Sequence, residues 1–483
     1  MSEMETVVGL EVHVELLTET KLFCGCSAAF GADPNTQVCP VCLGLPGETL
    51  PLLNAKAVEF AIKASLALNC TIAGHISFDR KNYFYADLPK GYQISQFFQP
   101  IGTRGFVEIV HDGETKKIGI HQIHLEEDTG KLIHLGDILS SPYSRVDFNR
   151  AGVPLIEIVT EPDIRSAEEA RLFLQKLRSI LRYLGISDCK MEEGSMRCDA
   201  NVSVRPRGSH IFGKKTELKN MNSFRSVYRG IEYEARRQMD VLQEGGEVLP
   251  ETRHWDEVNE YTRAMRSKFV SADYRCFPDP NLPPLETARE WVDTIKGDIP
   301  ELPDVRLARF LSEYGLPEYD AEILTGTREL ADFYENTVKV FNDPKAVSNW
   351  TMGELLGLLN EAGKEIMECR VTPDNLGELL KMVQEGVISR NMGKTVLEAM
   401  FESGEKPGTI VEKKGLVQIS DEEALSDIIA RVIADNPKSV EDYHSGKKKA
   451  VGFLVGQVMK ETRGKANPQK VNEMLQAQLD RGN

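Results

Sequence analysis

Three carboxylates follow one another in the segment His121–Lys131, where Glu126, Glu127 and Asp128 end an alternating stretch typical of a β-strand. Adjacent carboxylates repel each other and raise one another's pKa, so water, a basic group or a hard cation such as Mg²⁺ must compensate their charge. Runs of like charge are usually solvated turns. The segment alone therefore indicates either a solvated acidic turn or one wall of a cation site.

A second strand-like segment, residues 9–16, carries two carboxylates and an imidazole. Its strict alternation places Glu11, His13 and Glu15 on one face and four aliphatic side chains on the other. An exposed edge strand has this pattern, and so does a preformed row of metal ligands whose apolar partners are buried. The sequence leaves both possibilities open.

Two further segments add polar groups to strand-like stretches. Residues 196–205 place Asp199, Asn201 and Ser203 opposite a row of apolar side chains, and Glu157 interrupts an apolar run. An acid in such a run is either paired or functional, because an unpaired buried carboxylate is strongly unfavourable. The four segments supply matching groups for one polar site.

Four of the nine cysteines lie in two close pairs, Cys24 with Cys26 and Cys39 with Cys42. Two such pairs across a short loop predict a tetrahedral structural zinc site, and Pro40 suits a tight knuckle. Four free cysteines in a loop are the alternative. Because sulfur would fill all four positions, zinc bound here would support the fold rather than the chemistry.

The composition bounds the class of protein. The 483-residue chain has a formal net charge of −16, with 41% hydrophobic and 27% charged residues. These proportions are ordinary for a globular protein of two to four domains, and the negative charge restricts any nucleic-acid contact to local basic patches. No apolar run reaches the ~18 residues of a membrane span, and the acidic start lacks a hydrophobic signal core. We therefore expect no membrane association and a cytoplasmic location.

The pattern of the chain changes twice, which predicts three domains. Residues 1–295 combine alternating segments with helices but without regular strand–helix alternation, which predicts an α+β domain with a mostly antiparallel sheet. Residues 296–405 have helical periodicity throughout and predict an all-α bundle. Residues 406–483 are expected to form a small α-helical tail after a linker at 403–408. Within the first domain, the spacing predicts helices over residues 54–68, 166–184 and 224–242.

One apparent nucleotide-binding motif does not hold. The segment NMGKT at residues 391–395 resembles the end of a phosphate-binding loop, but position 388, where the pattern needs glycine, is Ile388. No strand precedes it, so we expect a helical turn. ATP, if used, would then be held by metal and basic side chains.

Seven long motifs in order resemble the B subunit of the aspartyl/glutamyl-tRNA amidotransferase, and the resemblance covers essentially the whole chain. They read VVGLEVHVEL (7–16), FDRKNYFY (78–85), KGYQISQ (90–96), HLEED (124–128), DFNRAGVPLIE (147–157), MEEGSMRCDAN (191–201) and ELKNMNSF (217–224). The segment GFLVGQ at residues 452–457 extends the resemblance into the tail.

This resemblance implies a fold and a reaction. The expected first domain is a catalytic cradle similar to the glutamine synthetase fold, followed by a helical domain and a tail that contacts tRNA. The expected enzyme is an ATP-dependent carbon–nitrogen ligase that phosphorylates the side-chain carboxylate of Glu-tRNA(Gln) or Asp-tRNA(Asn). Ammonia, released from glutamine by a partner amidase (the A subunit) in a complex that includes a small C subunit, then displaces phosphate. Mg²⁺ and Zn²⁺ are the expected cofactors.

The residue types suggest how this chemistry is distributed. Phosphoryl transfer depends on Mg²⁺ held by carboxylates and on cations near phosphate. The first choices for Mg²⁺ are His13, Glu127 and Asp199, followed by Glu11 and Glu126. Because neighbouring strand residues point to opposite faces, only one of Glu126 and Glu127 is expected to bind directly. Either could accept a proton from attacking ammonia.

Basic and aromatic side chains complete the expected site. Lys81 and Arg150 are the chosen catalytic cations, with Arg80 and Arg197 as further candidates for a phosphate or ammonia path. Tyrosines could pack against the terminal adenosine of the tRNA, although ordinary core tyrosines are the alternative. The tyrosines considered are Tyr83, Tyr85 and Tyr92.

The tail is the expected tRNA-binding module. Between Glu441 and Lys470, seven basic residues accompany three acids, a local balance of +4. Such a segment binds tRNA phosphates or is a solvated helical face. The residues predicted to contact tRNA are Lys447, Lys448, Lys449, Arg463 and Lys465.

Two other classes of function stay open at this stage. A stand-alone carboxylate–amine ligase would act on free glutamate with ATP and ammonium, and would have no use for a basic tail. A non-catalytic tRNA-binding scaffold would leave the activity of its complex unchanged when Glu127 or Asp199 is lost.

Overall fold

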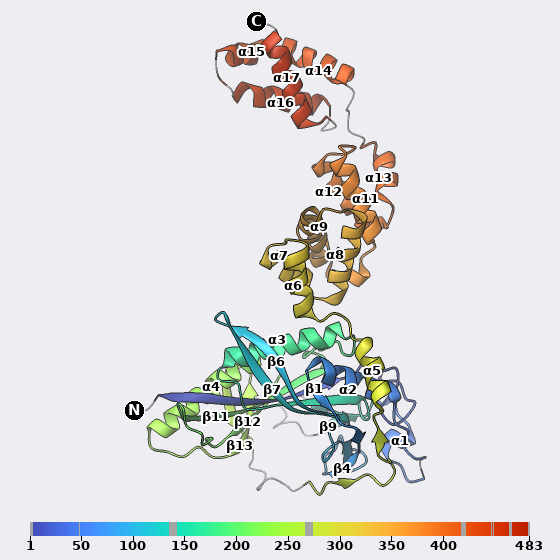
Figure 1. The fold of residues 1–483 in the computed structure, drawn as a ribbon, viewed down its shortest axis with the longest axis vertical. Helices are drawn as coiled ribbons and strands as arrows, with labels where there is room; N and C mark the ends of the chain where they lie inside the picture. The colour runs from blue at the N-terminus through green and yellow to red at the C-terminus, as the bar shows by residue number, and fades with distance from the viewer. Residues whose placement is uncertain are drawn as a thin grey trace. The chain divides into compact units, whose positions relative to one another are not determined.

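The structure, a computed structural model, describes residues 3–47, 49–134, 143–265, 274–416, 422–445, 447, 449–462 and 466–481. The chain divides into two compact units, Met1–Leu302 and Pro303–Asn483 (Figure 1). Within the described residues, no helix is both long enough and apolar enough to cross a membrane.

A nine-stranded sheet organises the described part of the first unit. Its strands in spatial order are β14 (Tyr261–Ala264), β13 (Glu251–Asp256), β12 (Thr216–Met221), β11 (Met196–Pro206), β1 (Met4–Glu15), β10 (Pro154–Thr160), β7 (Glu114–Glu127), β6 (Gly102–His111) and β2 (Thr71–Ile72). Neighbouring strands pair antiparallel except β12 with β13. The predicted α+β class and mostly antiparallel sheet are thereby confirmed.

Three helices cover one face of this sheet, α2 (Ala55–Ala67), α3 (Ala167–Tyr183) and α4 (Phe224–Gln243). Asn54, Ser166 and Ser223 cap their N-termini by accepting backbone N–H groups, which fixes where each helix begins. The three predicted helices are confirmed to within a residue or two. The aliphatic side chains of β1 point toward these helices and lie in one hydrophobic core with them.

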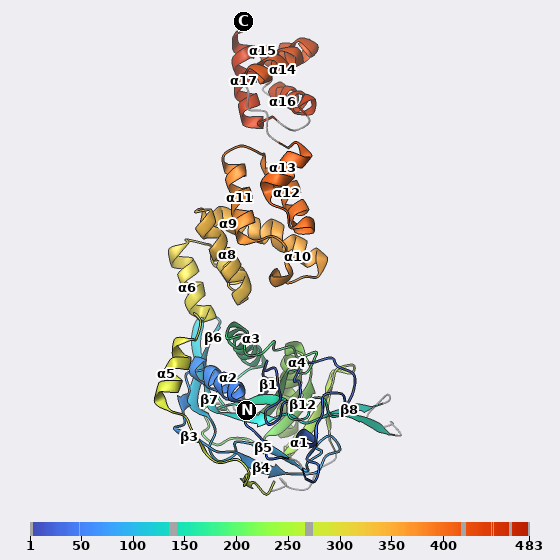
Figure 2. The same ribbon diagram turned by 90° about the vertical axis from the view of Figure 1, so that its right-hand side faces the viewer.

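Smaller elements lie on the opposite face. Both ribbon views place α3 on one side of the large sheet and β4 with β5 on the other (Figures 1 and 2). A small antiparallel sheet orders β15 (Phe277–Pro278), β4 (Asp79–Asn82) and β5 (Tyr92–Ser95). The remaining elements of this unit are α1 (Pro40–Leu43), α5 (Arg289–Gly297), the pair β3 (His75–Ile76) with β16 (Leu285–Glu286), and the pair β8 (Lys131–His134) with β9 (Ser144–Asp147).

The described part of the second unit is helical and contains two hydrophobic clusters. The first comprises residues of α6 (Pro303–Glu313), α7 (Glu318–Leu324), α8 (Arg328–Val340), α9 (Pro344–Trp350), a π-helical turn (Thr351–Leu355), α10 (Leu356–Ala362), α11 (Pro373–Gln384), α12 (Arg390–Ser403) and α13 (Pro407–Lys414), with a 3₁₀ turn at Ile366–Glu368. The second comprises residues of α14 (Glu422–Asp435), α16 (Lys449–Glu461) and α17 (Pro468–Arg481), with side chains of α15 (Pro437–His444) packed against it.

Two sequence-based expectations can be compared with these helices. The NMGKT segment lies within α12, as the predicted helical turn requires. The expected linker at 403–408 instead contains the start of α13, because Pro407 occupies the first turn, where its missing N–H costs nothing. Ile410 and Val411 then pack into the bundle core, so the bundle extends beyond residue 405.

Candidate active site

Strand register brings the acidic segments onto one face of the large sheet. His13 of β1 lies opposite Glu157 of β10, and Glu157 lies opposite His124 of β7. On the other side of β1, Glu11 lies opposite Asp199 of β11. Directly paired residues point to the same side of a sheet, so these side chains share the face that the large helices leave uncovered.

The first group of possible ligands on this face is His13, Glu126 and Glu157, with one ligand atom from each lying within 4.8 Å of the others. His13 Nε2 is 3.8 Å from a Glu157 carboxylate oxygen. Glu126 is held from the small sheet, where Ser95 Oγ donates to it at 2.8 Å and Gln93 Nε2 at 3.2 Å. The carboxylates are thus fixed in place and only partly satisfied.

The electrostatics of this first group favour a cation. Burial, and then the charge of Glu157, raise the pKa of Glu126 to about 7. Burial, and then the charge of Glu11, raise the pKa of Glu157 to about 7. Burial, and then Arg197, lower the pKa of His13 to about 3, which leaves its imidazole neutral and able to bind metal. A divalent cation here would offset the repulsion that raises the two carboxyl pKa values.

His124 adds a second buried imidazole beside this group. Its Nδ1 is 3.7 Å from the same Glu157 carboxylate, and neither ring nitrogen has a hydrogen-bond partner among the described residues. Burial lowers the pKa of His124, so the ring is neutral at pH 7.

The second group comprises Glu11, Asp199 and Glu217, again with ligand atoms within 4.8 Å of one another. Lys219 donates to Asp199 and lies 2.9 Å from Glu217, while Asn201 donates to Glu11 at 2.9 Å. Burial raises the pKa of Asp199 even though Lys219 opposes the shift. This group also has the composition of an oxygen-rich cation site.

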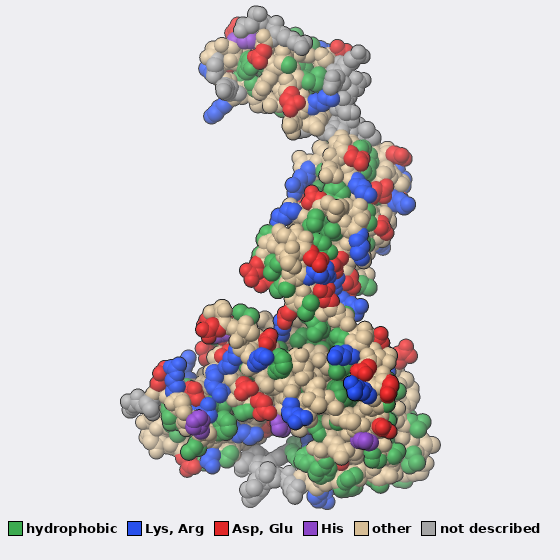
Figure 3. All heavy atoms as spheres, in the orientation of Figure 1, with side chains coloured by type: hydrophobic (Ala, Val, Ile, Leu, Met, Phe, Trp, Pro, Cys, Tyr) green, Lys and Arg blue, Asp and Glu red, His purple; other side chains and the backbone are tan. Residues whose placement is uncertain are grey.

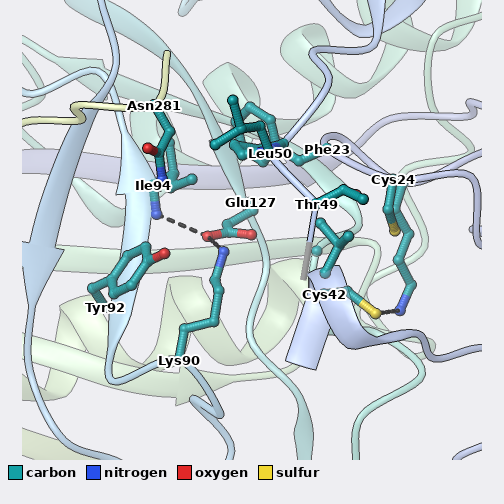
Figure 4. Close-up of a pocket in the computed structure, with 14 residues that line it drawn as sticks. Phe23, Cys24, Cys42, Thr49, Leu50, Lys90, Tyr92, Ile94, Glu127 and Asn281 are labelled. Carbon is teal, nitrogen blue, oxygen red and sulfur yellow. Dashed lines mark hydrogen bonds and ion pairs between the residues drawn. The ribbon is translucent and has the colours of Figure 1, made fainter. Parts of the chain in front are cut away.

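Glu127 lies apart from both groups. It accepts a hydrogen bond from Lys90 and one at 2.9 Å from the backbone N–H of Ile94 (Figure 4). The alternation predicted for Glu126 and Glu127 is therefore present, and Glu126 is the one that joins His13.

The predicted cations occupy two places. The charge of Lys81, on β4, lowers the pKa of Glu126 and Glu157 and so acts on the first group. Arg150 donates to the carbonyl oxygens of Thr129 and Gly130, and its Nε is 3.6 Å from Asp128.

Asp128 is the centre of a separate charged cluster. Arg197 donates to Asp128 at 2.7 Å. Burial would raise the pKa of Asp128, but Arg197 and Arg150 outweigh it and lower the pKa to about 2. Burial, and then Asp128, raise the pKa of Glu15 to about 8. Asp128 is thus neutralised within the protein, unlike the two open groups.

The predicted tRNA contacts have mixed surroundings. Tyr83 donates from its hydroxyl to Gln93 at 2.8 Å, and the Arg80 guanidinium lies 4.2 Å from the centre of the Tyr92 ring. Tyr85 is half exposed. In the tail, Lys447 pairs with Asp442.

The remaining tail predictions are only partly within the structure. Lys449 begins α16, whereas Lys448, Arg463 and Lys465 lie outside the described residues.

The four cysteines of the two pairs come together beside α1. Their sulfur atoms lie within 4.8 Å of one another. A tetrahedron with zinc–sulfur bonds of about 2.3 Å needs sulfurs about 3.8 Å apart, so the cluster fits zinc. A hydrogen bond with Cys24, together with other donors, lowers the pKa of Cys42 to about 4, so one ligand is already a thiolate.

Comparison with known proteins decides the family. Residues 6–293 match the family model described as "GatB/GatE catalytic domain", and residues 332–479 match "GatB domain". The chain is similar to the B subunit of the aspartyl/glutamyl-tRNA(Asn/Gln) amidotransferase of Carboxydothermus hydrogenoformans, with 59% identity over 99% of both chains. A protein of the same name from Brevibacillus brevis is 55% identical over 99% of this chain and 100% of its own. The chain belongs to the GatB/GatE family.

The GatB/GatE catalytic domain includes both carboxylate groups and the cysteine cluster, whereas the GatB domain match lies wholly in the helical unit. Sequence reasoning missed Glu217 as a possible ligand and did not choose Glu157 for metal. Glu217 alternates with Lys219 in β12 in the same way as the acids of β1, and that alternation was the available signal.

Proposed function

We propose that this chain is the B subunit of a tRNA-dependent amidotransferase and catalyses ATP-dependent conversion of the glutamyl or aspartyl group on tRNA to its amide. The observation that carries the proposal is the pair of carboxylate groups side by side on one sheet face, in a chain of the GatB/GatE family. Phosphoryl transfer is mostly positioning and charge neutralisation, and this face offers rigid groups for both.

The proposed division of labour follows the geometry. His13, Glu126 and Glu157 would hold one Mg²⁺, and Glu11, Asp199 and Glu217 a second. Bound Mg²⁺ would supply charge neutralisation at the ATP phosphates. Lys81 places a positive charge next to the first group, where it would orient a phosphate or a substrate carboxylate.

The reaction that these residues would serve has two steps. A substrate carboxylate oxygen bonds to the γ-phosphorus as its bond to ADP breaks, giving an acyl phosphate. Ammonia then attacks the acyl carbon and inorganic phosphate leaves. The proton released from nitrogen needs an acceptor, and Glu126 or Glu127 is placed to take it. Glu127 is held by Lys90 and Ile94 rather than by the ligand groups, so we assign it to this second step.

Zinc is proposed for the cysteine cluster, with Cys24, Cys26, Cys39 and Cys42 as its four ligands. Support comes from the short separations of the sulfurs and from the lowered pKa of Cys42. A site closed by four sulfurs leaves no position for substrate, so its role would be structural.

The tail and the partners follow from the same proposal. Positive and negative side chains are interspersed on the face shown in Figure 3, so tRNA phosphates would have to be met by local patches. We assign that role to the basic tail, including Lys447 and Lys449. Ammonia would come from a partner amidase, the A subunit, in a complex that includes a small C subunit. The cytoplasm is the proposed compartment.

One experiment separates this function from the two alternatives. ATP hydrolysis and amide formation are measured with ammonium as donor, with and without Glu-tRNA(Gln). We expect ATP turnover to require the aminoacyl-tRNA. Equal turnover with free glutamate would favour a small-molecule ligase. If the Glu126→Gln complex keeps full activity, the chain is a scaffold.

A further inference from the structure

Lys21 is a buried cation outside the two carboxylate groups. It is 0% exposed, and no carboxylate of a described residue forms an ion pair with it. Its ammonium group donates to Cys42 Sγ at 3.7 Å and to the carbonyl oxygen of Phe148 at 3.4 Å, and the bond to sulfur is drawn in Figure 4. Its polar partners are therefore a cysteine sulfur and a neutral carbonyl.

A buried ammonium ion is unfavourable unless an anion lies beside it. The Cys42 sulfur is the group here that can carry negative charge, and it also accepts the backbone N–H of Cys39 at 3.2 Å. Two donors on one sulfur stabilise a thiolate rather than a thiol. Zinc bound by four thiolates has a net negative charge, so the completed cluster would be a stronger anion than Cys42 alone.

We infer that Lys21 is the buried counter-ion of the cysteine cluster and positions Cys42 as a zinc ligand. The inference rests on the zinc site proposed above. It assigns Lys21 to the outer shell, which orients ligands and adjusts metal affinity without touching the metal.

The same lysine connects the cluster to the loop that carries Arg150. Phe148 accepts its hydrogen bond, and the N–H of Leu22 donates to Gly152 at 2.8 Å. A Cβ atom at Gly152, where φ is +89°, would lie 3.4 Å from Lys21 Cδ and 3.5 Å from Cys42 Cβ. This loop therefore packs directly on the lysine and the ligand that it positions.

A small cavity explains why the charge matters. Lys21, Cys24 and Cys42 line a space of about 50 Å³ that Lys90 and Glu127 line as well. Without the ammonium group, the Cys42 sulfur would lose one of its two donors beside this space. The cluster should then hold zinc less tightly.

The test compares Lys21→Met with Lys21→Arg in the full-length chain, with Lys56→Met as control because Lys56 is an exposed lysine paired with Glu59. Zinc affinity is measured by competition with a chromophoric chelator, and the thiolate-to-metal absorption band is recorded after cobalt substitution. Lys21→Met should weaken zinc binding about tenfold or more and shift the cobalt band. Lys21→Arg should stay closer to the wild-type affinity, and Lys56→Met should equal it.

The possible outcomes are distinct. A folded Lys21→Met chain with wild-type zinc affinity and an unchanged cobalt band would overturn the inference while leaving the zinc site intact. A wild-type chain without zinc would overturn both. If Lys21→Met is poorly folded, its loss of stability is compared in wild-type and Cys42→Ser backgrounds. The counter-ion role requires a smaller loss when Cys42 is absent, and equal losses contradict it.

Discussion

The two clusters of possible metal ligands in the first unit are built in opposite ways. The cysteine cluster is local, since its four ligands lie between residues 24 and 42 on loops and one short helix. The carboxylate groups are assembled by sheet register from segments as far apart in sequence as Glu11 and Glu217. A local cluster can close around its metal, whereas a row on a rigid sheet can leave positions open for substrate.

The largest expected effect comes from the carboxylate groups. Glu126→Gln and Asp199→Asn each remove one negative charge from a different group, so each should lower ATP-dependent amidation by at least about a hundredfold. Aminoacyl-tRNA binding should largely survive. Glu114→Gln, a change at the exposed far end of β7, is the control. More than about a tenth of wild-type turnover in both variants would remove these groups from the chemistry.

Glu127→Gln tests whether Glu127 belongs with the open groups. It leaves Lys90 buried without its anion, so the free energy of unfolding should fall by about 3 kcal/mol, measured by urea denaturation. The double change Glu127→Gln with Lys90→Met should recover part of this loss.

Its activity gives a second readout. We expect slower amide formation but an unchanged Mg²⁺ concentration for half-maximal ATP turnover. A Mg²⁺ requirement shifted as far as that of Asp199→Asn would place Glu127 among the ligands after all.

Cys39→Ser tests the closed cluster. Zinc content should fall from one per chain toward zero, and the melting temperature should drop by about 5 °C or more because metal binding stabilises the fold. Turnover of the folded protein should change by no more than about threefold, since a closed site takes no part in the reaction. An effect on turnover as large as that of Asp199→Asn would erase the distinction between the two clusters.

The smallest effect is expected from the tail. A deletion should begin at residue 417, because Ile410 and Val411 belong to the bundle core. The KM for aminoacyl-tRNA should rise severalfold and its salt dependence should flatten, because each lost phosphate contact removes counterion release. Turnover at saturating tRNA should be nearly unchanged. Equal tRNA affinities at two salt concentrations for full-length and truncated complexes would exclude the tail.

Periodicity predicted the local structure well but could not predict the pairing. Alternation placed Glu11 and His13 on one face, and N-cap residues such as Ser166 marked helix starts. Which strand lies beside β1 depends on contacts between residues more than a hundred positions apart. For that reason Glu157 became visible as a partner of His13 only in the folded structure.

The same limit explains the treatment of Glu127 and of the bundle boundary. Alternation shows that Glu126 and Glu127 diverge, but not which of them meets His13, because that depends on where Ser95 and Lys90 lie. The Gly and Pro residues at 404–408 have the composition of a linker. They instead end one helix and begin the next, since composition alone does not report the packing of Ile410.

The central position of β1 restricts how this protein can evolve. Glu11 belongs to one carboxylate group and His13 to the other, and both are fixed by a single strand paired on both sides. Inserting or deleting one residue would turn every later side chain of the strand to the opposite face, so that Val12 and Val14 would exchange places with the ligands. Residues 9–15 should therefore tolerate some changes of residue type but no change of length, and relatives that keep both carboxylate groups should align there without a gap.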